Sequence, residues 1–221
     1  MADFNSSYDK VLGAEGGYSN VASDLGGETY AGISRKYNPG WKGWSIIDSY
    51  KNKFSNNIIP RNTKFNDPTL SQLIRDFYKA TQWDVIYGDS INSQSVADII
   101  FDARVNQTGG LGFMVRNALN KSGKSGYPYY SAPAMKLPIT SQIIADTNSI
   151  NPSIFFNNFK QERENYYKYR ASIPGQEGNL QGWMNRLTHI TFKDIANNLP
   201  MIIIVVMMMA ASVYIIINNK S

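Results

Sequence analysis

Apolar residues recur at intervals of three and four along most of the chain, which is the spacing of one face of an α-helix. Capping residues, glycine or proline separate most of these segments. No run of alternating apolar and polar residues predicts a series of strands. The pattern therefore predicts a mainly α fold, with helices over residues 5–15, 67–81, 93–108, 111–119, 140–147 and 151–170.

Two of these helices have clear starts. Asp67 is the predicted N-cap of a helix whose first residue is Pro68, and the next helix opens at about Ser93. The helix that follows Ser93 has a predicted inward face made of Val96, Ile99, Ile100 and Ala103.

The first predicted helix carries a carboxylate on its apolar face. Tyr8, Val11, Leu12 and Glu15 follow one another at the helical spacing, and Gly16-Gly17 marks the end of the helix. Glu15 then falls in the last turn, where partial burial and the negative end of the helix dipole both disfavour ionisation. We expect its pKa to be raised, as a general acid requires.

Two further polar residues follow across a glycine-rich turn. Asp24 lies nine positions after Glu15, and Thr29 lies five positions after Asp24. Cleavage of a glycosidic bond needs a proton donor and, in most enzymes, a second carboxylate. Asp24 is the candidate for that second role, and Thr29 is a candidate for positioning a water. The spacing alone equally fits a surface glutamate at a helix end and an aspartate in a turn.

Residues 15–33 read Glu-Gly-Gly-Tyr, then Asp-x-Gly-Gly-x-Thr, then Gly-Ile. These motifs resemble the signature of glycoside hydrolase family 108, which comprises lysozyme-like N-acetylmuramidases of phages and bacteria. The resemblance implies a lysozyme-like helical fold and makes Glu15 the catalytic acid. The order of Glu15, Asp24 and Thr29 is similar to the triad of phage-type lysozymes, although here four rather than five residues separate Asp24 from Thr29.

Aromatic and amide side chains complete the predicted site. Trp41 either stacks on a sugar ring or, together with Trp44, anchors a loop to the core. Residues 77–84 resemble a Tyr-x3-Tyr-Trp element of the family, which implies that Trp83 lines or supports the cleft. Residues 101–106 resemble the family's core helix. Asp102 and Asn106 lie one turn apart on one face of this helix, where a buried Asp–Asn pair either holds the helix in place through hydrogen bonds, which is the role we favour, or takes part directly in catalysis. The predicted substrate-binding set is Tyr18, Tyr30, Trp41, Trp83 and Asn106.

The second half of the chain has its own pattern. Residues 120–138 are rich in Gly, Ser, Pro and Tyr and predict an irregular linker. Phe156-x-x-Phe159-x3-Arg163 and the later Gly182-Trp183-x-Asn185-Arg186 are similar to the predicted peptidoglycan domain that accompanies family 108. We therefore expect a lysozyme-like catalytic region over residues 1–92 and a small helical lobe over residues 93–195.

The chain ends in an apolar segment. Residues 201–217 carry no charge, and residues 199–217 reach the short end of a membrane span. A buried core helix is the alternative, but a protein of this size has little interior to surround one. We expect residues 199–217 to cross a lipid bilayer, with the catalytic region facing the cell wall. The first residues show no signal peptide.

Composition narrows the chemistry. The chain has no cysteine and one histidine, His189, which excludes thiol nucleophiles and histidine-rich metal sites. We expect no cofactor and no metal. The net charge of +5 suits an anionic partner such as cell wall or a lipid surface. The basic residues are scattered and form no phosphate-binding loop, so we expect no nucleic-acid partner.

Together these features predict a peptidoglycan hydrolase, an endolysin-like muramidase that cuts the glycan strand with Glu15 as general acid. The alternative is a catalytically silent, membrane-anchored protein that binds the cell wall or assists secretion.

Overall fold

The computed structural model describes residues 1–12, 16–21, 26–131 and 137–193. This part of the chain is mainly helical, as predicted. Its α-helices are α1 Phe4–Leu12, α2 Gly43–Lys51, α3 Pro68–Tyr78, α4 Gln94–Asn106, α5 Leu111–Lys121, α6 Ser141–Asn148, α7 Pro152–Ala171 and α8 Leu180–His189.

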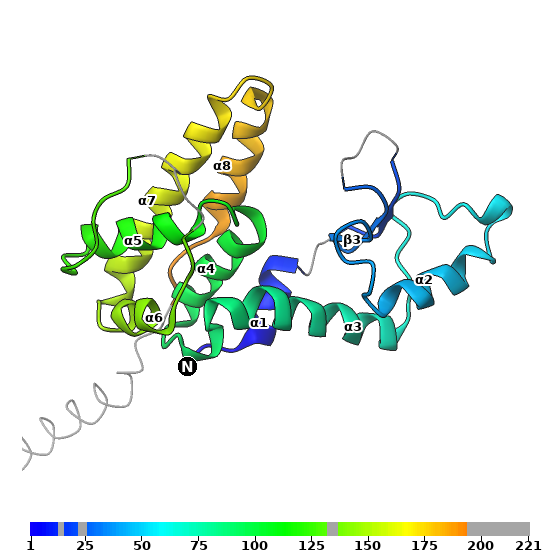
Figure 1. Ribbon diagram of the computed structural model, residues 1–221, viewed down its shortest axis with the longest axis horizontal. Helices are drawn as coiled ribbons and strands as arrows, with labels where there is room; N and C mark the ends of the chain where they lie inside the picture. Colours follow the sequence, from blue (N-terminus) through cyan, green and yellow to red (C-terminus); the bar gives the residue numbers. More distant parts are fainter. Residues whose placement is uncertain (13–15, 22–25, 132–136, 194–221) are drawn as a thin grey trace, which may run out of the picture.

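The helices form two groups (Figure 1). Helices α4 to α8 gather at one end, while α2 and a small sheet lie at the other end. Helix α3 runs between the two groups, and α1 packs against α4. The end of α1 therefore lies where the two groups meet, next to the segment that leads into the sheet.

The sheet was not predicted. Its three strands are β1 Tyr18–Ser19, β2 Thr29–Tyr30 and β3 Ile33–Ser34, paired antiparallel in that order. Strands of two residues are too short to show alternation in a sequence, which is why the pattern missed them. Ala31 and Gly32 connect β2 to β3 with φ values of 47° and 77°, the left-handed geometry of a tight hairpin turn.

The core lies around α4. Val96, Ile99, Ile100 and Ala103 are all buried, which confirms the predicted inward face. Phe101 packs edge-on against Trp83 with ring centroids 5.5 Å apart, and both residues contact Phe4 of α1. One continuous cluster of buried side chains extends from Ala2 to Tyr166, so it crosses the predicted boundary between residues 92 and 93.

The predicted helix starts are confirmed by their caps. Asp67 accepts a hydrogen bond from the Leu70 N–H, and Ser93 accepts one from the Val96 N–H. Thr140 and Asn151 cap α6 and α7 in the same way. The helix predicted over residues 67–81 is not uniform, because α3 ends at Tyr78 and a π-helical turn, Lys79–Trp83, follows it.

Three predictions concern parts of the chain that lie outside the described residues. Glu15 and Asp24 fall there, and so does the apolar segment 199–217. Among residues 1–12, 16–21, 26–131 and 137–193, no helix has the length and apolar character needed to cross a bilayer.

Candidate active site

The last turn of α1 separates two depressions of the molecule. Tyr8 and Leu12 face the smaller one, which we call the tyrosine hollow. Lys10 and Val11 face the larger one, which we call the α4 groove. Leu12 and Gly16 flank the segment that contains Glu15, and both line the tyrosine hollow. The candidate acid is therefore bracketed in sequence by residues of this hollow.

The tyrosine hollow has a volume of about 180 Å³. It lies between α1, the turn after β2 and α3, and three tyrosines contribute to its wall. The Tyr78 hydroxyl donates a hydrogen bond of 2.8 Å to the Ala31 carbonyl oxygen, and the Tyr30 hydroxyl accepts one of 2.9 Å from the Phe65 N–H. Burial raises the pKa of Tyr30 above its usual value. The lining residues are Tyr8, Leu12, Gly16, Tyr30, Ala31, Lys64, Phe65, Ser71, Ile74 and Tyr78.

The second glycine after the candidate acid, Gly17, lies where a side chain would not fit. A Cβ at this position would lie 2.2 Å from the Thr63 carbonyl oxygen, so no larger residue fits without a backbone shift. The same carbonyl accepts a 2.8 Å hydrogen bond from the Tyr18 N–H, and the Tyr18 carbonyl accepts one of 2.7 Å from the Asn62 N–H. These contacts fix the chain directly after residues 15 and 16 against the loop that precedes α3.

The α4 groove is much larger, at about 700 Å³. Its walls come from α1, α4, the end of α8 and the residues after α8. The lining residues are Lys10, Val11, Ser95, Asp98, Asp102, Arg186, His189, Ile190, Thr191 and Lys193.

Asp102 of this groove is held by a buried ion pair. The fully buried Arg163 of α7 donates a 2.5 Å hydrogen bond to one Asp102 carboxylate oxygen, and Arg186 of α8 lies 3.6 Å from the other. Asn106 also donates to Asp102, as the sequence predicted, but Asn106 is exposed. The predicted Asp–Asn hydrogen bond is therefore present, but only Asp102 is buried, and Asp102 is also bound by Arg163, which lies 61 residues away on another helix.

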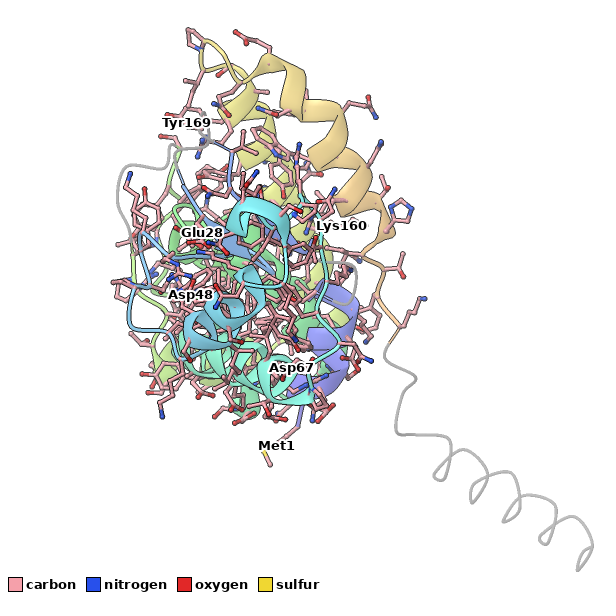
Figure 2. The ribbon with its side chains drawn as sticks, turned by 90° about the vertical axis from the view of Figure 1, so that its right-hand side faces the viewer. Met1, Glu28, Asp48, Asp67, Lys160 and Tyr169 are labelled. Carbon is pink, nitrogen blue, oxygen red and sulfur yellow. The ribbon has the colours of Figure 1, made fainter. Side chains whose placement is uncertain are left out.

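A second ionic cluster ties the sheet to α2. The Tyr18 hydroxyl donates to Glu28, whose carboxylate also contacts Arg35 at 2.6 Å and Lys51 at 2.9 Å. Arg35 in turn donates two hydrogen bonds to Asp48, which lower the pKa of that carboxyl below its usual range. Glu28 and Asp48 are both labelled in Figure 2. With this set of partners, Glu28 stabilises the sheet.

The remaining predicted site residues lie in different surroundings. Tyr30 lines the tyrosine hollow but is only 4 % exposed, and its neighbour in β2, Thr29, is partly buried and outside that lining. Tyr18 is only 4 % exposed, and burial raises its pKa. Trp41 donates its indole N–H to the Leu73 carbonyl at 3.2 Å and packs edge-on against Trp44, which is the geometry of a loop anchor.

Trp83 differs most from the predicted substrate contact. Its side chain is 0 % exposed, and its indole N–H donates a 2.7 Å hydrogen bond to Asp89. A ring enclosed on all sides cannot stack on a sugar, so Trp83 supports the core between α1 and α4. The aromatic spacing around residue 83 could not separate these roles, because lining and supporting rings are identical in sequence.

Sequence reasoning assigned no role to Arg163 or Arg186. Both residues lie within the C-terminal motifs, and in the structure both reach Asp102 of α4. Arg163 follows Phe156 and Phe159 at helical spacing, so it falls on the apolar face of its helix. An arginine at such a position is the signal that could have indicated a distant carboxylate partner. Within the described part of the chain, His, Asp and Glu side chains form no cluster suited to a metal ion.

A known protein family matches the part of the chain that forms the tyrosine hollow. Residues 8–108 match the model of a family described as Glycosyl hydrolase 108. The matched range holds the sheet, α2, α3, α4 and most of α1, and therefore every residue of the tyrosine hollow. No curated protein matches the chain.

One solved structure, that of SagA from Brucella abortus, shares the fold across most of the chain. It is 17% identical to this chain in sequence, with a TM-score of 0.53. The alignment covers 85% of this chain and 90% of that one. The likeness therefore extends beyond the matched family range into the helices α5 to α8.

Proposed function

We propose that this chain is a glycoside hydrolase that cuts the glycan strands of peptidoglycan. The observation that carries the proposal is the position of residue 15. It lies inside the range that matches the family model, and its described neighbours Leu12 and Gly16 line the tyrosine hollow. A carboxylic acid at this point of the chain has, as its nearest described neighbours in sequence, two residues of a small, partly aromatic hollow.

In the proposed reaction, the Glu15 carboxylic acid protonates the oxygen that leaves the broken bond between N-acetylmuramic acid and N-acetylglucosamine. Asp24 and Thr29 act on the opposite side, where they position water or stabilise the positive charge that develops on the sugar. Thr29 is the neighbour of Tyr30 in β2, although its own side chain is not part of the lining of the hollow. Tyr8, whose side chain is partly exposed, offers ring surface to the apolar face of the substrate, while Tyr30 and Tyr78 are buried parts of the same wall.

The place of action follows from the substrate. We assign residues 199–217 to a membrane-spanning helix that keeps the catalytic region at the cell wall. The support for this assignment is the uncharged apolar sequence of residues 201–217.

The test is the product released from purified peptidoglycan by the full-length chain in detergent. We expect products that end in a reducing N-acetylmuramic acid, identified by mass spectrometry before and after borohydride reduction. Glu15→Gln should lower the rate by about 10²- to 10⁴-fold, since that is the range attributed to a positioned general acid. Glu177→Gln is the matched control, because Glu177 is an exposed carboxylate beyond α7.

Other products would correct the proposal in defined ways. Reducing N-acetylglucosamine ends would place the cut at the other glycosidic bond. No release by the wild type, together with retained binding to the wall, would support the catalytically silent alternative.

A further inference from the structure

The α4 groove contains two carboxylates, and both are occupied by partners within the protein. Asp98 contacts Lys10 at 2.5 Å and accepts a 2.6 Å hydrogen bond from Ser7. Asp102 is bound by the fully buried Arg163. Neither aspartate therefore leaves an uncompensated negative charge facing the groove.

The cations of the groove have fewer or weaker partners within the described residues than its carboxylates have. Arg186 is 42% exposed and lies 3.6 Å from Asp102, whose other oxygen already holds Arg163. The Lys193 side chain is exposed, and within the described residues it forms no ion pair. Arg186 and Lys193 belong to one segment, residues 186–193, together with His189. The groove thus presents an excess of positive charge along one wall.

This wall is fixed in place. The Lys193 N–H donates a 2.9 Å hydrogen bond to Ser95 of α4, and Lys160 of α7 donates one of 2.5 Å to the Ile190 carbonyl. Phe192 packs edge-on against Phe156 of α7, with ring centroids 5.5 Å apart. Two backbone hydrogen bonds and one ring contact therefore fix the segment that carries the cations beside the groove before any ligand arrives.

The location connects the groove to the proposed cut. Lys10 and Val11 line it, while Tyr8 and Leu12, in the same turns of α1, line the tyrosine hollow. A glycan strand bound in the hollow would carry its substituents toward the end of α1, because this helix lines both depressions. The groove volume of about 700 Å³ leaves room for more than a sugar ring.

We infer that the α4 groove binds the peptide stems of peptidoglycan through their carboxylates, with Arg186 and Lys193 as the binding cations. Stems attached to N-acetylmuramic acid carry free carboxylates well away from the sugar, whereas a strand without stems keeps only the lactyl carboxylate on each N-acetylmuramic acid. The groove would thus select stem-bearing glycan strands over bare ones. This inference rests on the proposed function.

The experiment compares glycan strands with intact stems, strands whose stem carboxylates have been amidated, and strands whose stems have been removed. For the wild-type full-length chain we expect the highest kcat/KM on intact stems. Arg186→Gln and Lys193→Gln should each lower that value roughly tenfold, since one charge-assisted hydrogen bond is worth about that factor. Both variants should leave hydrolysis of stem-free strands unchanged.

Lys168→Gln is the matched control, because Lys168 is an exposed cation of α7 that pairs with Glu164 outside the groove. Lys193→Gln should fold like the wild type, because the hydrogen bond from Lys193 to α4 is donated by its backbone N–H and is kept in the variant. Equal wild-type rates on all three substrates would overturn the inference, and so would equal losses on intact and stem-free strands.

A binding measurement separates the two proposals. Isolated disaccharide-peptide, with free or amidated carboxylates, is titrated into Glu15→Gln and into Glu15→Gln combined with Lys193→Gln. Weaker binding of the amidated ligand, and of the double variant, would support the stem site even if the wild type cut no strand. Equal affinity for both ligands would refute it even if the hydrolase activity were confirmed.

Discussion

At the scale of single residues, close backbone contact holds the chain next to the tyrosine hollow. Gly17 lies so tightly against the loop before α3 that a Cβ there would fall 2.2 Å from the Thr63 carbonyl oxygen. Gly16, one residue earlier, has no atom within 4 Å of the position that a Cβ would take. The two adjacent glycines therefore differ in what they permit.

Gly17→Ala should lower the free energy of unfolding by about 1–3 kcal/mol, which is the usual range for overpacking a tight site. The added methyl would meet the Thr63 carbonyl at 2.2 Å, and the pairing between Tyr18 and Thr63 would have to shift. Urea unfolding followed by circular dichroism measures the change. Gly16→Ala is the control, with an expected change below that of Gly17→Ala. Equal effects of the two substitutions would show that the close contact with Thr63 is not what destabilises the Gly17→Ala variant.

At the scale of elements, hydrogen bonds attach the predicted linker to α6. The Tyr127 hydroxyl donates a 2.6 Å hydrogen bond to Asp146, and Lys124 contacts the same carboxylate at 2.9 Å. Burial and the Asp146 carboxylate raise the pKa of Tyr127 from 10.0 to about 12. The hydrogen bond from Tyr127 lowers the pKa of Asp146. An irregular segment is thereby fastened to a helix.

The raised pKa of Tyr127 determines how the stability of the protein changes at alkaline pH. Because its folded pKa is raised, the contribution of Tyr127 is complete below pH 10.0 and is lost as the pH rises through about 12. Tyr127→Phe should therefore lower the melting temperature at pH 8 and flatten its decline between pH 10 and 12. Differential scanning fluorimetry across this range measures both effects. Tyr37→Phe, at an exposed tyrosine, should change neither, and an unchanged alkaline decline in Tyr127→Phe would contradict the assignment.

Elements also show how far sequence reasoning extends. The caps at Asp67 and Ser93 and the buried face of α4 were predictable, because capping and helical periodicity act within a few residues. The sheet was not, since two-residue strands carry no period. Trp83 was predicted to contact substrate but is buried, and Arg163 was given no role. The burial of Trp83 and the ion pair of Arg163 both depend on residues that are distant in the sequence. A local sequence pattern does not identify such partners.

At the scale of the whole molecule, the two helix groups meet at α1. Ser7 and Lys10 bind Asp98 of α4, while Arg75 of α3 contacts Asp9 on another face of the same helix. The tyrosine hollow and the α4 groove open on either side of this helix. A substrate that used both would bridge the two helix groups, so their relative position would determine how it meets Glu15.

The proposed anchor gives the last prediction. If residues 199–217 span a bilayer, the full-length chain should stay in the membrane pellet after a carbonate wash. Val205→Arg combined with Met208→Arg should release it, because each arginine near the centre of a span costs roughly 2.5–3.5 kcal/mol of insertion free energy. Asn197→Arg, which adds the same charge outside the segment, should leave the chain in the pellet. Wild-type protein in the supernatant would refute the anchor, and retained hydrolysis by the released double variant would show that catalysis does not require it.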